Sequence, residues 1–160
     1  MSAMPLAQLK FINQLTLEPS AGTRAGSAAR EKGVSGIPHP ELSGTKARIP
    51  GQDTLYVIDR HGYRRRIPFP LTFVNLFRDS AFRGMLVSST VAEIAEGPAL
   101  DDDALLLRGA ASEQVYLLDG GRKRLIDGRR VMEKYGFNEA AVVVAPQAIV
   151  NALRDGDVWE

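Results

Sequence analysis

The chain has 160 residues, 44% of them hydrophobic and 24% charged, which is typical of a folded protein of one domain or two small ones. Twenty Lys and Arg against nineteen Asp and Glu leave a net charge of +1, which argues against binding to nucleic acid or membrane by gross charge. The sequence contains no cysteine, which excludes disulfides, thiolate nucleophiles and cysteine zinc sites.

The first segment, residues 1–18, is predicted to contain a short amphipathic helix, because apolar side chains recur at every third position. Such a helix is suited to covering a core or to docking on a partner protein. The segment has neither a basic start nor an unbroken apolar run, so we expect no secretory signal. No apolar run in the chain approaches the roughly 20 residues of a membrane-spanning helix. The stripe consists of Leu6, Leu9, Ile12 and Leu15.

Residues 19–39 differ in composition from the rest of the chain. Gly, Ser and Pro make up ten of the 22 positions from 19 to 40, which leaves few large apolar side chains for a core. This composition predicts a flexible linker. Together with the helix, it forms a flexible N-terminal extension.

Beyond residue 40 the sequence repeats itself. Residues 55–59, Leu-Tyr-Val-Ile-Asp, correspond to Val-Tyr-Leu-Leu-Asp at 115–119, sixty residues later. The spacing then becomes 59, and the one-residue change falls in a turn, where length varies most easily. We therefore predict two tandem repeats, residues 40–98 and 99–160, which share one core because each is too small to fold alone. The matches after the turn are Gly62 with Gly121, Arg65 with Arg124, and Ile67 with Ile126.

Each repeat is predicted to be a β-hairpin followed by a helix, a strand and a second helix, which gives an α+β fold class. The predicted elements of the first repeat are strands at 46–49, 55–59 and 63–67, a helix at 71–78, a strand at 85–88 and a helix at 89–95. Those of the second are strands at 105–108, 115–119 and 122–126, a helix at 129–135, a strand at 141–145 and a helix at 146–153. The residues expected in the shared core are Leu55, Val57, Ile67, Phe73, Val115, Leu117, Ile126, Met132, Val143 and Leu153.

The block at 115–124, the Ile two places after it and a helix ending in Gly136-Phe137 together resemble a tandem repeat of bacterial proteins. Those repeats often read Tyr-Leu-Ile-Asp-x-Gly-x-Lys-Arg-x-Ile-Pro, and they commonly accompany secreted or surface proteins, including cell-wall hydrolases. The likeness covers about residues 40–160. The first repeat keeps the Ile67-Pro68 pair, whereas the second has Ile126-Asp127 in its place. The resemblance implies a non-catalytic accessory or binding module at a secreted or surface location.

The basic hairpins are the candidate ligand sites. Arginine forks beside tyrosines are suited to phosphate, carboxylate or sugar hydroxyls, and the aspartates can accept sugar hydroxyls. The alternatives are that the arginines are solvated side chains which discourage edge pairing, and that the aspartates cap their turns. The candidate ligand-binding residues are Tyr56, Asp59 and Arg65 in the first repeat, and Tyr116, Asp119 and Arg124 in the second.

Other polar features suggest no chemistry. Asp101-Asp102-Asp103 reads as a solvated connection between the repeats, or as a partner for the basic hairpin of another copy in self-association. His39 and His61 have no ligand or catalytic partner in the sequence, and both are expected to be exposed. No nucleophile, metal or phosphate-binding motif is present, so we expect no catalytic residue, metal or cofactor.

We therefore predict a binding module that recognises a glycan or cell-envelope polymer. Two like sites on one body would raise avidity for a polymer. The alternative is a structural or adaptor protein that docks on a partner through its N-terminal helix. Nucleic-acid binding is the least favoured, because of the overall charge and the acidic stretch.

Overall fold

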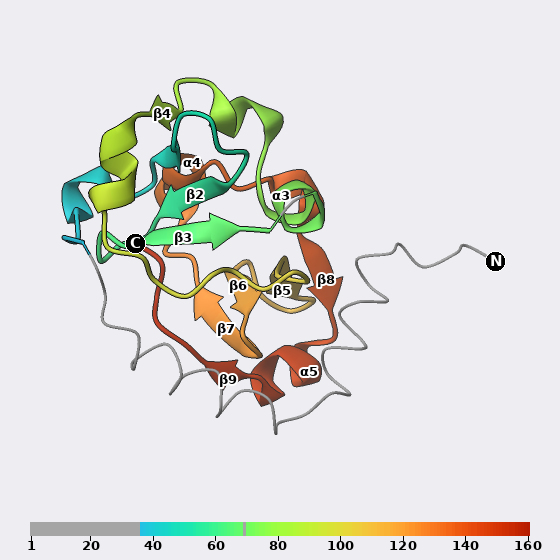
Figure 1. Cartoon of the computed structure of the whole chain (residues 1–160). Helices are drawn as coiled ribbons and strands as arrows, with labels where there is room; N and C mark the ends of the chain where they lie inside the picture. Colours follow the sequence, from blue (N-terminus) through green and yellow to red (C-terminus); the bar gives the residue numbers. More distant parts are fainter. Residues whose placement is uncertain (1–35, 69) are drawn as a thin grey trace.

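The computed structural model describes residues 36–68 and 70–160, an α+β protein with two mixed sheets and few helices (Figure 1). The helix predicted within residues 1–18 lies outside the described residues. The first half (36–98) contains η1 (Pro40–Leu42), β1 (Lys46–Arg48), β2 (Leu55–Ile58), β3 (Arg64–Ile67), α3 (Leu71–Leu76), η2 (Asp79–Phe82), β4 (Leu86–Val87) and η3 (Ser89–Glu93), where η marks a 3₁₀ helix. The second half (99–160) contains β5 (Leu105–Gly109), β6 (Val115–Asp119), β7 (Arg122–Leu125), α4 (Arg129–Tyr135), η4 (Glu139–Ala141), β8 (Val143–Ala145), α5 (Gln147–Ala152) and β9 (Arg154–Asp155).

The first sheet has the strand order β3-β2-β1-β4, with β1 antiparallel to β2 and parallel to β4. Strands β2 and β3 form a hairpin in which Val57 faces Arg65. Its turn requires a glycine, because Gly62 has φ +87° and a Cβ there would lie 2.3 Å from the backbone nitrogen of His39. The turn is thereby held against the segment that precedes η1.

The second sheet has the order β8-β5-β6-β7-β9, with a central antiparallel meander and a parallel strand at each edge. After β9 the chain continues beside β7 in the same direction, and Trp159 forms a parallel bridge with Ile126 just beyond that strand. In the first sheet, a single parallel bridge between Arg64 and Glu96 occupies the position beside β3 that β9 has beside β7. The two sheets lie one above the other in Figure 1.

The largest cluster of buried apolar side chains draws on both halves. Val57 and Ile67 contribute from the first sheet, Leu106 and Leu117 from the second, and α3 and α4 close its side. Its centre is aromatic: the Phe77 and Phe137 rings stack with centroids 5.4 Å apart. The two sheets are therefore held together by one central core, hereafter the central core.

The outer face of each sheet carries a smaller cluster. Val91 and Ile94, in and after η3, pack on Tyr56 and Ile58 of the first sheet. Val150 of α5 packs on the corresponding face of the second sheet, and so do Val143 and Leu153. The prediction that Val143 and Leu153 join the central core is therefore wrong, because strand alternation turns Val143 toward α5 and leaves Val144 on the inner side. The other predicted core residues belong to the central core or pack against it.

The predicted strands, the helix at 129–135 and their order agree with the structure within two residues at most ends. The helix predicted at 89–95 is the 3₁₀ helix η3 over 89–93, with the Ser88 side chain accepting from the backbone nitrogen of Thr90. Residues 19–35 of the predicted linker lie outside the described residues. Residues 36–39 are part of the fold, since Ile37 pairs with Ile94 and the His39 nitrogen donates to the Gly62 carbonyl at 2.9 Å. No helix among the described residues is long and apolar enough to cross a membrane.

Candidate functional site

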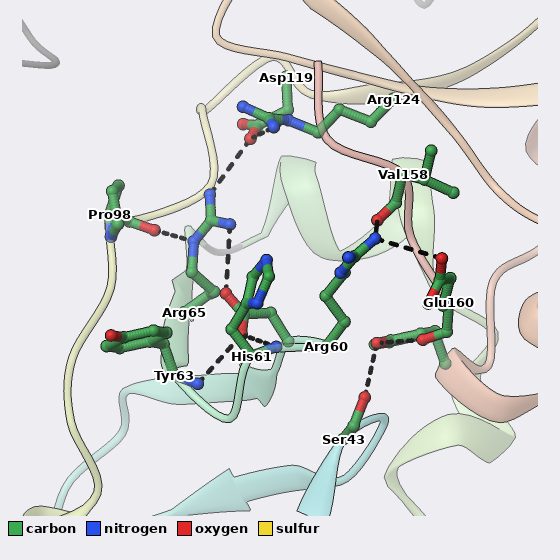
Figure 2. Close-up of polar contacts among 12 residues, drawn as sticks. Ser43, Arg60, His61, Tyr63, Arg65, Pro98, Asp119, Arg124, Val158 and Glu160 are labelled. Atoms are coloured by element: carbon green, nitrogen blue, oxygen red, sulfur yellow. Dashed lines mark hydrogen bonds and ion pairs between the residues drawn. The ribbon is translucent and has the colours of Figure 1, made fainter. Parts of the chain in front are cut away.

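Four of the six predicted ligand-binding side chains gather between the two hairpins (Figure 2). We call this group the charge cluster: Asp59, Arg65, Asp119 and Arg124. Asp59 is 7%, Arg65 9% and Asp119 3% exposed. Three of the four are thus buried, which neither an open ligand site nor a solvated hairpin edge would require.

Arg65 is the centre of the charge cluster. Its Nη1 lies 3.7 Å from Asp59 Oδ2 in its own half, and its Nη2 lies 3.3 Å from Asp119 Oδ2 in the other half. Its Nε donates to the Pro98 carbonyl, and Arg124 Nε lies 3.7 Å from the same Asp119 oxygen. Because all these charges have opposite partners within 4 Å, the charge cluster binds one hairpin to the other rather than presenting free charges.

The two aspartates hold backbone as well as charge. Asp59 Oδ1 accepts from the backbone nitrogens of His61 and Tyr63 at 2.9 and 3.0 Å, which is the predicted turn cap. In the second half, Asp119 Oδ1 instead accepts from the backbone nitrogen of Asp101. The turn after Asp119 is bonded by Asp101, whose Oδ2 accepts from the Gly120 nitrogen. Burial, together with the Asp119 carboxylate, raises the pKa of Asp101. Asp101 is therefore part of the hairpin structure and not of a solvated connection.

The two predicted tyrosines do not belong to the charge cluster. Strand alternation places them on the outer faces of the sheets, where Tyr56 is 6% exposed and Tyr116 is half-buried. The Arg64 guanidinium lies 4.9 Å from the Tyr56 ring centroid, and Lys123 Nζ lies 5.5 Å from that of Tyr116. The six predicted residues thus form no single site in either half.

Two glycines outside the hairpins explain how the stems of Arg65 and Arg124 are covered. A Cβ at Gly97 would lie 2.9 Å from Arg65 Cδ, and one at Gly156 would lie 3.0 Å from Arg124 Cγ. The chain therefore passes directly over each arginine stem. In the same region, Arg60 Nη1 donates to the Val158 carbonyl at 2.9 Å (Figure 2). This hydrogen bond connects the last residues of the chain to the first hairpin.

Concave surface is found instead beside β8 and α4. A groove of about 760 Å³ opens there, at the end of the central core. Charged residues of both signs line it too, among them Arg108, Asp127, Arg129 and Glu139. Arg108 lies 3.5 Å from Glu113. We call this feature the β8 groove; its apolar lining consists of Val115, Leu125, Ile126, Met132, Val142 and Val144.

Val144 is the most accessible apolar residue of the β8 groove, with 45% of its surface exposed. It faces Arg108 across the β5–β8 pair. In the first half, Val87 faces Arg48 in the same way and is 47% exposed. The two valines therefore offer a matched pair for substitution.

The buried Lys46 is a further charged group outside the charge cluster. Its Nζ donates to the carbonyls of Tyr135 and Gly44 and lies 4.9 Å from the Phe77 ring centroid. Burial lowers the pKa of Lys46 to about 7, with a smaller contribution from Arg78. In the equivalent place of the second sheet, opposite Leu117, the chain has Leu106. Lys46 thus caps the carboxyl end of α4 at the cost of burying an amine.

The remaining predicted polar residues lie at the surface or serve the fold. The His39 ring pairs with Glu41 at 2.7 Å, and His61 is exposed at the hairpin tip. The backbone carbonyls of Asp101 and Asp102 accept from the Thr72 hydroxyl. In the part of the chain that the structure describes, no group of His, Asp and Glu side chains is arranged to hold a metal ion.

Comparison with known proteins adds no relative: no protein-family model, curated protein or solved structure matches this chain. Its function must therefore be inferred from its own residues.

Proposed function

We propose that the protein is a non-catalytic binding module built from a duplicated repeat, and that its binding surface is the β8 groove. The observation that carries this proposal is the groove itself, a hollow lined by apolar side chains and by charged residues of both signs. Protein-binding sites typically combine an apolar centre with a polar margin. The ligand class that fits is an apolar segment of another protein.

Duplication is supported by contacts that recur 59 residues apart. The Gly97 nitrogen donates to the Arg64 carbonyl, and the Gly156 nitrogen to that of Lys123. Arg64 pairs with Glu96 at 2.9 Å, and Lys123 with Asp155 at 3.3 Å.

The contact between the halves is also reciprocal. The Arg78 nitrogen donates to the Gly136 carbonyl, and the Asn138 nitrogen donates to the Leu76 carbonyl. Residues 76 and 78 precede 136 and 138 by sixty. Such reciprocity is what a two-fold relation between two copies produces. We therefore place the charge cluster and the Phe77–Phe137 stack on this internal axis, where they hold the two halves together.

Glycan recognition by the hairpins, which the resemblance implies, has weaker support. Sugar binding needs an exposed aromatic face and free polar groups, whereas Tyr56 is buried beneath Arg64. Asp59 and Arg65 satisfy each other and their neighbours. A ligand would have to displace these contacts to reach either group.

The proposal is tested by selecting random linear peptides, displayed on phage, against the full-length protein. Counter-selection against Val144→Asp removes peptides that bind elsewhere, since an aspartate in the groove opposes an apolar ligand. The matched control is Val87→Asp, which changes an equally exposed valine on the other sheet. We expect peptides that bind the parent and Val87→Asp but lose binding to Val144→Asp. Failure to enrich any such peptide would overturn the proposal.

A further inference from the structure

The β8 groove is open because two side chains are smaller than their counterparts in the first half. Met132 and Val142 follow Phe73 and Phe82 by 59 and 60 residues. Phe73 and Phe82 pack on the central core with ring centroids 4.1 Å apart. Met132 and Val142 line the β8 groove. The first half therefore fills with two aromatic rings the place that the second half leaves hollow.

The strand beside the groove is an edge. In the described sheets, β8 ends the order β8-β5-β6-β7-β9 and pairs with β5 alone. An edge strand has backbone donors and acceptors on its outer side that can pair with an added strand. Val144, at the centre of β8, is among the residues that line the groove. A peptide added along β8 would hence lie beside the hollow.

We infer that the occupant of the β8 groove is an extended peptide that adds a strand to β8 and inserts an aromatic side chain between Met132 and Val142. The inference rests on the proposed function and names its ligand. The inserted ring takes the place that Phe73 and Phe82 fill in the first half. The main chain supplies affinity through strand pairing, and the aromatic pocket supplies specificity.

The charged lining adds a constraint on the residues beside the aromatic one. Asp127 and Glu139 lie in the same lining as Arg108 and Arg129. Arg108 forms an ion pair with Glu113, whose side chain is 98% exposed, and Arg129 forms an ion pair with Glu133. A lining of both signs favours peptides whose flanking charges are also mixed rather than strongly acidic or strongly basic.

The first test refills the groove with the residues of the first half. The double variant Met132→Phe/Val142→Phe is compared with the parent by titration of a selected peptide into the full-length protein. We expect at least about a thirtyfold loss of affinity, the size typical of losing a buried anchor. Thermal unfolding of the unbound variant checks that it folds, with a melting temperature equal to or above that of the parent.

The second test changes the peptide and leaves the protein intact. Replacing its aromatic residue by alanine should cause a similar loss, and N-methylation of alternate backbone nitrogens should weaken binding while methylation of the residues between them does not. Three results would each overturn the inference. They are selected peptides that lack an aromatic residue, undiminished binding to the Met132→Phe/Val142→Phe variant, and an effect of N-methylation that does not alternate along the peptide. In each of those cases binding to the β8 groove itself still stands. If no peptide distinguishes Val144→Asp from Val87→Asp, the proposed function fails instead.

Discussion

Replacing Lys46 by methionine should stabilise the protein at neutral and lower pH. The pKa of Lys46 is about 7 in the fold, against its ordinary value of 10.5. At about 1.4 kcal/mol per pH unit, this difference corresponds to a penalty of about 5 kcal/mol when the buried amine is charged. Methionine preserves the unbranched apolar stem of the lysine side chain as far as Cε and removes the charge. It also removes the donor to the Tyr135 and Gly44 carbonyls, which costs about 1–3 kcal/mol.

The sign of the pH dependence follows from proton binding. Between pH 7 and 10.5 the unfolded chain keeps the Lys46 proton and the folded chain does not, so the free energy of unfolding rises with pH. Below pH 7 both states are protonated and the full penalty remains. We therefore expect Lys46→Met to be more stable than the parent at pH 6 by about 2–4 kcal/mol. The advantage should shrink with rising pH and reverse between about pH 8 and 10, where the remaining penalty falls below the cost of the lost donor.

The assay is urea unfolding of parent and variant at pH 6, 7, 8, 9 and 10, with the difference between them isolating Lys46 from other titrating groups. Lys134→Met is the control, because Lys134 is exposed and donates to the Glu160 carbonyl. It should leave the pH dependence as in the parent. A constant difference between Lys46→Met and the parent from pH 7 to 10 would refute the reasoning, since the amine would then be charged in the fold throughout.

Three further predictions concern the scaffold, each read out by chemical denaturation. Arg65→Ala leaves Asp59 and Asp119 without their shared partner and should lower the free energy of unfolding by about 3–5 kcal/mol. The control Arg66→Ala changes an exposed arginine and should cost under about 0.5 kcal/mol. Equal losses would mean that the charge cluster does not hold the hairpins together. Gly62→Ala should cost more than Gly121→Ala, because both have positive φ but only the first places a Cβ against backbone, and the reverse order would contradict this packing. Leu117→Ala should cost about 2–5 kcal/mol, and a change within error would remove Leu117 from the central core.

The strands could be predicted from sequence because their signals are local. Alternation around Val57 and Leu117, and glycines at the turns, are enough to place both hairpins. The short strand β9 and the 3₁₀ helices η1, η2 and η4 were not predicted, since two to four residues carry no period. They exist because neighbouring segments supply their hydrogen bonds, as when the Gly156 nitrogen donates to the Lys123 carbonyl.

The candidate site could be predicted only in part, because burial of the arginines is a tertiary effect. Spacing alone shows Asp59 and Arg65 on one hairpin, but not that Asp119 arrives from the other half or that Gly97 lets the chain cross above the arginine. The groove left a clearer signal. At positions 59 and 60 residues apart, the second half has Met132 where the first has Phe73 and Val142 where the first has Phe82. A loss of side-chain volume in one half alone indicates a hollow there.

The central claim, that the β8 groove is the binding surface, is tested most directly by amide chemical-shift mapping of the full-length protein as a selected peptide is added. The largest changes should fall at residue 108 and in residues 113–116, 125–132 and 139–144, which include the groove lining. Mapping reports the surface without any substitution in the protein. Largest changes at residues 59–65 and 119–124 would contradict the claim and return the binding site to the hairpins.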